Sequence, residues 1–156
     1  MNINEVLDNS HVAVMQSIDD LPEAVWDMPG VAGEWSAKDT LAHLTSRELL
    51  LIDILKTFQG EQPSPYIRRW LEDRASFDAE TVQSRAYQTA QLVENEYEDA
   101  QLRSSALLTD VVDAQATISW LQPPVSLADF VQSLADHARE HANQLAQFRD
   151  KNKNIE

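Results

Sequence analysis

Two histidines four residues apart near the C-terminus are the side chains of this sequence best suited to chemistry. His137 and His141 lie on a stripe of residues that recurs every three or four positions, the spacing of one face of a helix. The apolar members of this stripe are Leu127, Phe130, Leu134, Leu145 and Phe148. Side chains four residues apart project from adjacent turns on one side, so the two imidazoles can bind one metal ion. The alternative is a pair of core histidines whose ring nitrogens are satisfied by neighbouring polar groups.

A third histidine, His43, lies within two turns of the start of an earlier predicted helix. At about 100° per residue it falls beside Leu50 and Ile54, inside a broad apolar arc. Three protein nitrogens with open positions for water or substrate are typical of a catalytic metal site, whereas four protein ligands are typical of a structural one. The sequence therefore predicts one divalent metal ion bound by the three histidines.

The remaining histidine, His11, falls between Leu7 and Val14 on the first predicted helix, a position compatible with an inward orientation. As a fourth ligand it would indicate a structural metal. We expect instead an ordinary core or boundary histidine.

Three polar side chains are weaker candidates for a supporting role, and the catalytic residues are otherwise unknown. Gln144 lies one turn after His141 and can hydrogen-bond a ligand or a substrate. Glu140 and Glu48 can orient imidazoles as carboxylate partners. Each also has an ordinary interpretation, as a helix-flanking residue for Gln144 and as surface residues for the two glutamates.

The elements that must position these residues are helices, because strand-like alternation is scarce and helical spacing recurs throughout. We predict long helices over 3–18, from Ser36 to before Gly60, over 79–108 after Asp78 as its cap, and over 127–149. A short helix is expected over 66–73, and at most a helical turn within 19–35. Ser36 with Asp39 and Ser126 with Asp129 are typical of helix starts. The fold class is therefore all-α, an up-and-down type four-helix bundle, with a single domain over 1–150 and a polar tail over 151–156.

Composition restricts the partners. The chain of 156 residues has 26 acidic and 12 basic side chains and a formal net charge of −14. Such a surface repels phosphate backbones and anionic membranes, so we expect a small-molecule substrate, no nucleic acid and no membrane. No signal peptide is recognisable and no apolar run is long enough for a bilayer, which favours a cytoplasmic protein. Cysteine is absent, so a thiol used in any reaction must arrive on a small molecule.

Two segments resemble a known family. Residues 33–44, which contain W-S-A-K-D-T-L-A-H-L, are similar to the "W-S-x-K-D-x-L-x-H-L" motif of the DinB-like superfamily. Residues 137–145 resemble its "H-x-x-x-H-x-x-[HQ]-[IL]" helix. The resemblance implies a four-helix bundle in which His43, His137 and His141 bind zinc, nickel or a similar ion. Members of the superfamily often form dimers, so it also implies a homodimer. A histidine that is common just before the last ligand is Glu140 here.

The resemblance also favours one reaction. The superfamily includes bacillithiol-dependent transferases and the metal-binding domain of mycothiol-dependent maleylpyruvate isomerase. It therefore implies an enzyme that transfers a low-molecular-weight thiol as co-substrate, a thiol S-transferase. Two alternatives stay open on the residues alone: a metal-dependent hydrolase, and a non-catalytic small-molecule-binding, metal-binding or resistance-type protein.

Overall fold

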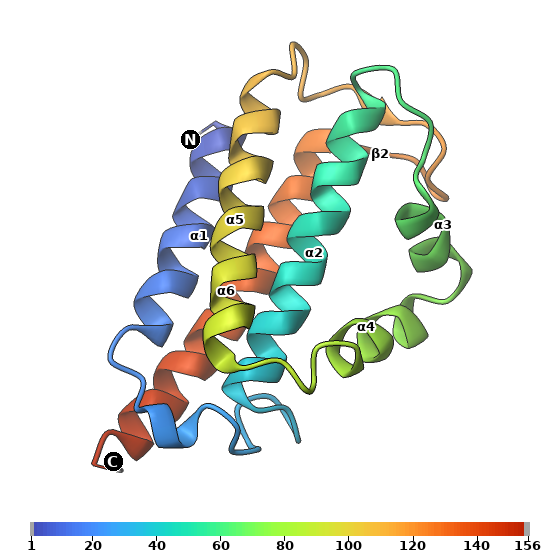
Figure 1. Ribbon diagram of the computed structural model, residues 1–156. Coiled ribbons are helices and arrows are strands. Elements are labelled where there is room, and N and C mark those ends of the chain that lie inside the picture. The colour runs from blue at the N-terminus through green and yellow to red at the C-terminus, as the bar shows by residue number, and fades with distance from the viewer. Residues whose placement is uncertain (1, 155–156) are drawn as a thin grey trace.

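Four long helices dominate the computed structural model, which describes residues 2–154 (Figure 1). These are α1 (Ile3–Ile18), α2 (Ala37–Thr57), α5 (Ala90–Thr109) and α6 (Leu127–Asn152). Shorter elements connect them: η1 (Glu23–Val25), α3 (Pro65–Glu72), α4 (Arg74–Gln83), β1 (Thr117–Ile118) and β2 (Val125–Ser126). The all-α class and the four-helix bundle expected from the sequence are confirmed.

The two predicted helix starts are present. Ser36 and Asp39 form a reciprocal capping box at the start of α2, with the Asp39 amide 3.0 Å from Ser36 Oγ and the Ser36 amide 3.1 Å from Asp39 Oδ2. At the start of α6, Ser126 Oγ accepts the Asp129 amide at 3.0 Å. These caps fix where the two helices that carry His43, His137 and His141 begin.

The prediction of one helix over 79–108 was wrong. Two helices, α4 and α5, occupy this stretch, and residues 84–89 join them. Their N-caps are Asp73, which accepts the Ser76 amide, and Thr89, which accepts the Leu92 amide. Asp78 is consequently an interior residue of α4 and no cap. The linker contains no glycine or proline, so the sequence has no strong signal for the break.

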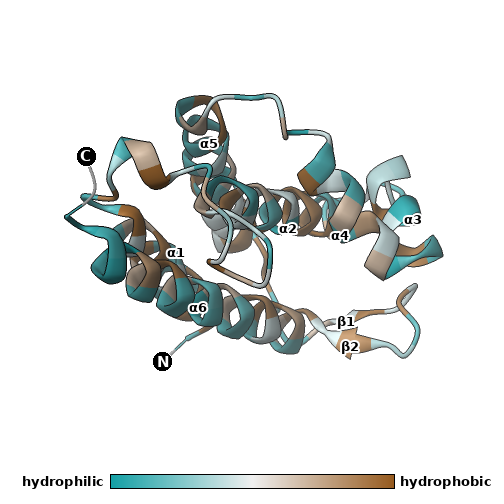
Figure 2. Ribbon diagram, turned by 90° about the horizontal axis from the view of Figure 1, so that it is seen from below, coloured by the Kyte–Doolittle hydropathy of each residue, from teal (hydrophilic) through white to brown (hydrophobic). Residues whose placement is uncertain are grey.

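Packing places the long helices in two pairs. α1 packs most extensively on α6, and α2 on α5 (Figures 1 and 2). α2 and α5 run in the same direction because α3 and α4 carry the chain back along one side of the bundle (Figure 1), so the bundle departs here from the alternating order of an up-and-down type. These two short helices therefore lie outside the four-helix core, where α4 reaches the outer side of α2.

Smaller elements close the end of the bundle where α6 begins. β1 pairs antiparallel with β2 through Thr117 opposite Ser126. The Gln122–Pro123 peptide in the connection is cis. α6 continues to Asn152, past the end expected near residue 149, and residues 155 and 156 of the expected tail lie outside the described residues.

The apolar core has two parts with polar side chains between them. One part is built around Leu41, Tyr97 and Leu145, and the other around Leu50, Leu108 and Val131. Between these parts three helices contribute a buried polar residue: His11, Glu48 and Ser104, exposed by 6%, 2% and 0%. A buried polar side chain costs free energy unless it is hydrogen-bonded, so this layer requires internal partners.

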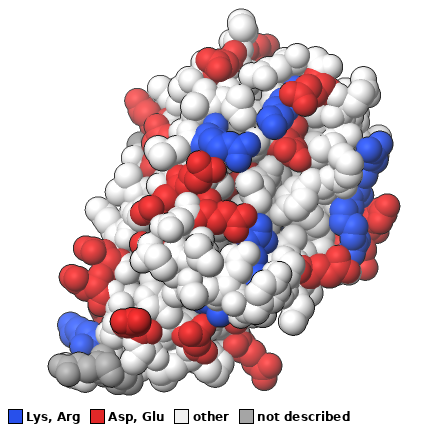
Figure 3. All heavy atoms as spheres, in the orientation of Figure 1, with Lys and Arg blue, Asp and Glu red and all other residues white. Residues whose placement is uncertain are grey.

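Acidic side chains are spread over the face of the molecule seen in Figure 3, as the net charge leads one to expect. Among the helices of residues 2–154, none combines the length and the hydropathy needed to cross a bilayer.

Candidate metal centre

Three histidines converge from two helices. α2 supplies His43 and α6 supplies His137 and His141, one turn apart. His137 Nε2 lies 2.9 Å from His43 Nε2 and 3.1 Å from His141 Nε2. One nitrogen of each ring lies within 4.8 Å of the others. The structure thus brings together the three residues that the sequence singled out.

The distances fit a common metal ion. With metal–nitrogen bonds of about 2.0–2.1 Å, two nitrogens lie about 3.3 Å apart in a tetrahedral site and about 2.9 Å apart at adjacent octahedral positions. The two Nε2–Nε2 distances of 2.9 and 3.1 Å lie close to these values. Three imidazoles leave at least one coordination position free for a small molecule in either geometry.

Two of the rings have a polar side chain behind them, one within hydrogen-bond range and one beyond it. Gln144 Oε1 lies 2.8 Å from His141 Nδ1, so this nitrogen donates and the Nε2 lone pair points to the centre of the cluster. Asp78 Oδ1 lies 3.7 Å from His43 Nδ1, on the side away from the cluster. A carboxylate behind a metal-binding histidine fixes its tautomer in the same way.

Asp78 is the residue of this site that the sequence analysis missed. Its other oxygen accepts from Arg47 at 2.8 Å, which holds the carboxylate next to α2. His43 Nδ1 and Asp78 Oδ1 are both buried and have no hydrogen-bond partner within residues 2–154. A gap of 3.7 Å is too long for a hydrogen bond, so the two groups interact through charge and not through a shared proton.

Burial lowers the pKa of two histidines of the cluster, His43 and His137. The pKa of His43 is lowered to about 3, first by burial and then by the positive charges of Arg47 and the two other histidines. Burial also lowers the pKa of His137, together with His141 and Arg47, against an opposing effect of Glu140 and Asp78. Neutral imidazoles have the free lone pairs that a metal requires.

The cluster is buried on one side and accessible on the other. His43 is 2% exposed and His141 9% exposed, whereas His137 is an exposed residue. The Trp35 ring lies against His43, with centroids 4.9 Å apart, and 6.4 Å from the His141 ring. A small molecule therefore approaches the cluster from the side of His137.

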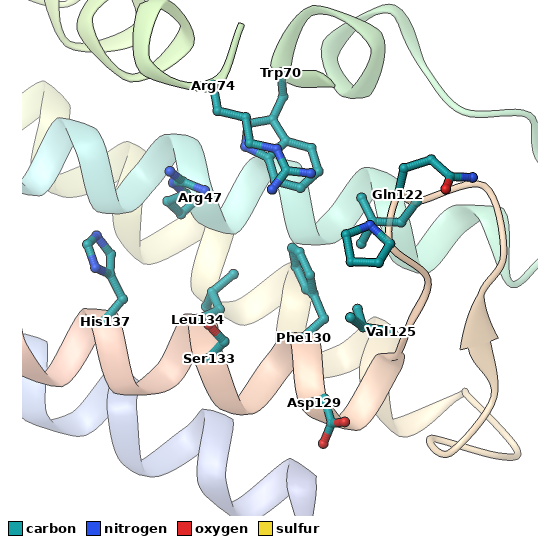
Figure 4. Close-up of a pocket in the computed structure, with 12 residues that line it drawn as sticks. Arg47, Trp70, Arg74, Gln122, Val125, Asp129, Phe130, Ser133, Leu134 and His137 are labelled. Carbon is teal, nitrogen blue, oxygen red and sulfur yellow. The ribbon is translucent and has the colours of Figure 1, made fainter. Parts of the chain in front are cut away.

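That side opens into a pocket of about 430 Å³. His137 and Arg47 lie at one end, and the pocket continues between α6 and the short helices along Leu134, Phe130 and Trp70 (Figure 4). Its volume lies in the range of small-molecule sites, about 300–1,000 Å³. The cluster and the pocket together have the arrangement of a binding site whose polar end is the three histidines.

The other candidates from the sequence lie elsewhere. Glu48 is buried and contacts His11 Nε2 at 2.8 Å and Ser104 Oγ at 2.5 Å. His11 Nδ1 faces Ser105 Oγ at 3.2 Å, so His11 is a core histidine with its own partners. Glu140 is exposed and acts on His137 only through its charge. Of the three supporting candidates, Gln144 alone contacts the cluster within the described part of the chain.

Comparisons with known proteins identify the family. Neither the curated proteins nor the solved structures gave a match to the chain. A family model described as the DinB superfamily matches residues 7–145, a range that includes all three histidines of the cluster.

Proposed function

The chain belongs to the DinB superfamily, and on this premise we propose that His43, His137 and His141 bind one divalent metal ion in a thiol S-transferase. The observation that carries the metal site is the convergence of three Nε2 atoms on one point, with Gln144 behind His141. Zinc and nickel are the ions we expect, because neutral imidazole suits both.

The metal supplies one chemical function, which is to lower the pKa of a coordinated thiol or water. The chain's residues do the rest. Gln144 and Asp78 keep the imidazole lone pairs directed at the ion, and the exposed side at His137 admits the thiol. Since the sequence has no cysteine, the thiol is a small co-substrate.

The proposed transfer forms one bond, breaks one bond and releases one proton. The sulfur of the small thiol forms a bond to an electrophilic carbon, and the leaving group departs with the electrons of the broken bond. The thiol proton passes to solvent. The pocket beside His137 holds the electrophile next to the sulfur, which replaces an encounter of two free molecules by a reaction within one complex.

Metal content tests the first part of this proposal. We expect about one equivalent of metal in the untagged protein, none in the variant with all three histidines replaced by alanine, and unchanged content in His11→Gln. The His11 variant is the matched control because it also removes a buried imidazole of the bundle. Equal metal in the triple variant, or none in the wild type after reconstitution, would contradict the assignment.

Activity tests the second part. The metal-loaded protein should accelerate the reaction of small thiols with aryl halides or epoxides, and the triple alanine variant should not. Hydrolysis of activated esters without thiol transfer would favour the hydrolase instead. Metal binding with neither activity would favour a binding or resistance-type protein and overturn the transferase.

A further inference from the structure

The pocket beside His137 has apolar walls. Trp70 from α3 and Phe130 from α6 face each other edge to face, with ring centroids 6.0 Å apart and planes at 85°. Leu134 lies on the same side of α6 as His137 (Figure 4). Such walls favour a flat apolar group, because aromatic side chains offer both contact area and a defined ring geometry.

Two guanidinium groups also line this pocket. Arg47 lies at the end near His137, and the Cζ atom of Arg74 lies 4.4 Å above the centre of the Trp70 ring. This is notable in a chain with 12 basic and 26 acidic residues. The acidic side chain among the lining residues, Asp129, points away from the pocket (Figure 4). The charge of Arg47 is paired with Asp78 at 2.8 Å, so the net positive charge at this pocket is that of Arg74, and it favours an anion against the charge of the whole molecule.

Donors at the pocket wall lack acceptors. Arg47 Nη2 donates to Asp78 at 2.8 Å, but Arg47 Nε is buried without a hydrogen-bond partner among residues 2–154. The indole nitrogen of Trp70 is likewise buried without a hydrogen-bond partner among these residues. An unsatisfied buried donor lowers the stability of the free protein, so an acceptor that reaches either nitrogen gains a hydrogen bond that no protein group makes. Arg74 lies over the indole and is exposed, so its side chain can move aside for that acceptor.

We propose that this pocket binds a small carboxylic acid with a flat apolar body, its carboxylate on Arg47 and its body between Trp70, Phe130 and Leu134. The carboxylate then lies next to His137, and the carbon atoms nearest to it lie at the histidine cluster. As a statement about the substrate class, this rests on the proposed function. As a statement about binding, it requires neither metal nor turnover.

Binding of 3-phenylpropanoate to metal-free protein, followed by NMR of the indole N–H signals, tests the proposal. The carboxylate should shift the Trp70 signal in a saturable way and leave that of Trp26, in the other half of the core, unchanged. The corresponding amide and 3-phenylpropylamine should bind about tenfold or more weakly, because hydrogen bonds between charged groups are the stronger ones.

Arginine variants show whether the affinity for 3-phenylpropanoate depends on this pocket or only on the overall charge of the protein. Arg47→Met should weaken the binding of 3-phenylpropanoate by about tenfold, because it removes the guanidinium that holds the carboxylate. Arg74→Gln, at an exposed side chain that moves aside for the carboxylate, should weaken it by about threefold or less. Arg68→Gln removes the same charge from an exposed position of α3 and should change the affinity less than about twofold. The dispersion of the NMR spectrum reports whether each variant is folded.

Three results would overturn the proposal. These are equal affinity for the acid, the amide and the amine; no shift of the Trp70 signal; and binding that appears only after zinc is added and does not depend on Arg47. The last result would identify the acid as a metal ligand. Failure of the metal-content experiment would leave this binding intact, so the two proposals fail separately.

Discussion

His11 and His43 are both buried histidines of the same bundle, and they have very different surroundings. Both ring nitrogens of His11 have partners, Glu48 at 2.8 Å and Ser105 at 3.2 Å, and Ser104 adds a contact to Glu48 at 2.5 Å. His43 points its Nε2 at a second histidine, 2.9 Å away, and its Nδ1 at a carboxylate just out of hydrogen-bond range.

The difference lies in what completes each cluster. The His11 cluster is closed by the protein's own side chains, within a layer that joins the two halves of the apolar core. The His43 cluster collects nitrogen lone pairs at one point and opens beside a pocket. Burial of a histidine therefore says little about metal binding, and the orientation of its lone pairs decides the matter.

The largest expected effect concerns the closed cluster. Glu48→Ala leaves His11 Nε2 and Ser104 Oγ without their partner and should lower the free energy of unfolding by about 3–5 kcal/mol. Chemical denaturation measures it. Glu140→Ala, at an exposed glutamate of α6, should change stability by less than about 0.5 kcal/mol. If folded Glu48→Ala protein lost its metal as completely as the triple histidine variant, the two clusters would be one unit and the comparison would fail.

A smaller effect tests the carboxylate behind His43. Asp78→Asn keeps the size of the side chain and removes the charge, and should weaken metal binding by about 10–100-fold. Competition with a chelator of known affinity measures this change. Glu140→Gln, which removes a charge near His137 without touching a ring, should weaken binding less than about fivefold. Equal effects of the two substitutions would mean that Asp78 acts through charge alone and does not orient the ring.

The smallest effect is the pH dependence of the stability of the metal-free protein. The unfolded chain binds a proton at His43 near pH 6.5, whereas the folded protein, with a pKa of about 3, does not. Acid therefore favours the unfolded state, and stability that is complete above pH 6.5 is lost as the pH falls towards 3. Through His43 alone, the free energy of unfolding should be about 1.4 kcal/mol lower at about pH 5.5 than at about pH 7.5.

Denaturation at both pH values, in the wild type and in His43→Gln, isolates this contribution. The variant should lack about that much of the pH dependence, while the part due to His137, whose pKa is also lowered, remains. The same pH dependence in both proteins would mean that His43 is protonated in the folded state, contrary to its burial.

The sequence predicted the main helices and the helical faces of the three histidines because those features depend on local rules, and the resemblance to the DinB-like superfamily implied that the three histidines act together. Ser36 caps through Asp39 three residues away, and His137 and His141 share a face because they are four apart. The position of Glu48 also follows from helical spacing. It comes five residues after His43 and so lies about 140° around the helix, where it faces His11.

Asp78 and the break before α5 show the opposite case. No local pattern connects Asp78 with His43, because the two residues meet only when α4 folds back against α2. The break within 84–89 contains neither glycine nor proline. Thr89 caps α5, but a threonine by itself does not distinguish a helix start from an interior position. Apolar periodicity continues on both sides of it, which favoured one long helix in the prediction.

The sequence by itself determined the residue types and their helical faces, since both follow from a period of about 3.6 residues and from capping within one turn. It thereby determined that His137 and His141 share one face of their helix and that His43 lies within the apolar arc of another. Only the tertiary structure decided that His11 is closed off by Glu48, that Asp78 lies behind His43, and that Arg47 and Trp70 share a pocket with His137. Those contacts join residues far apart in the chain, and their geometry depends on how the helices pack against one another.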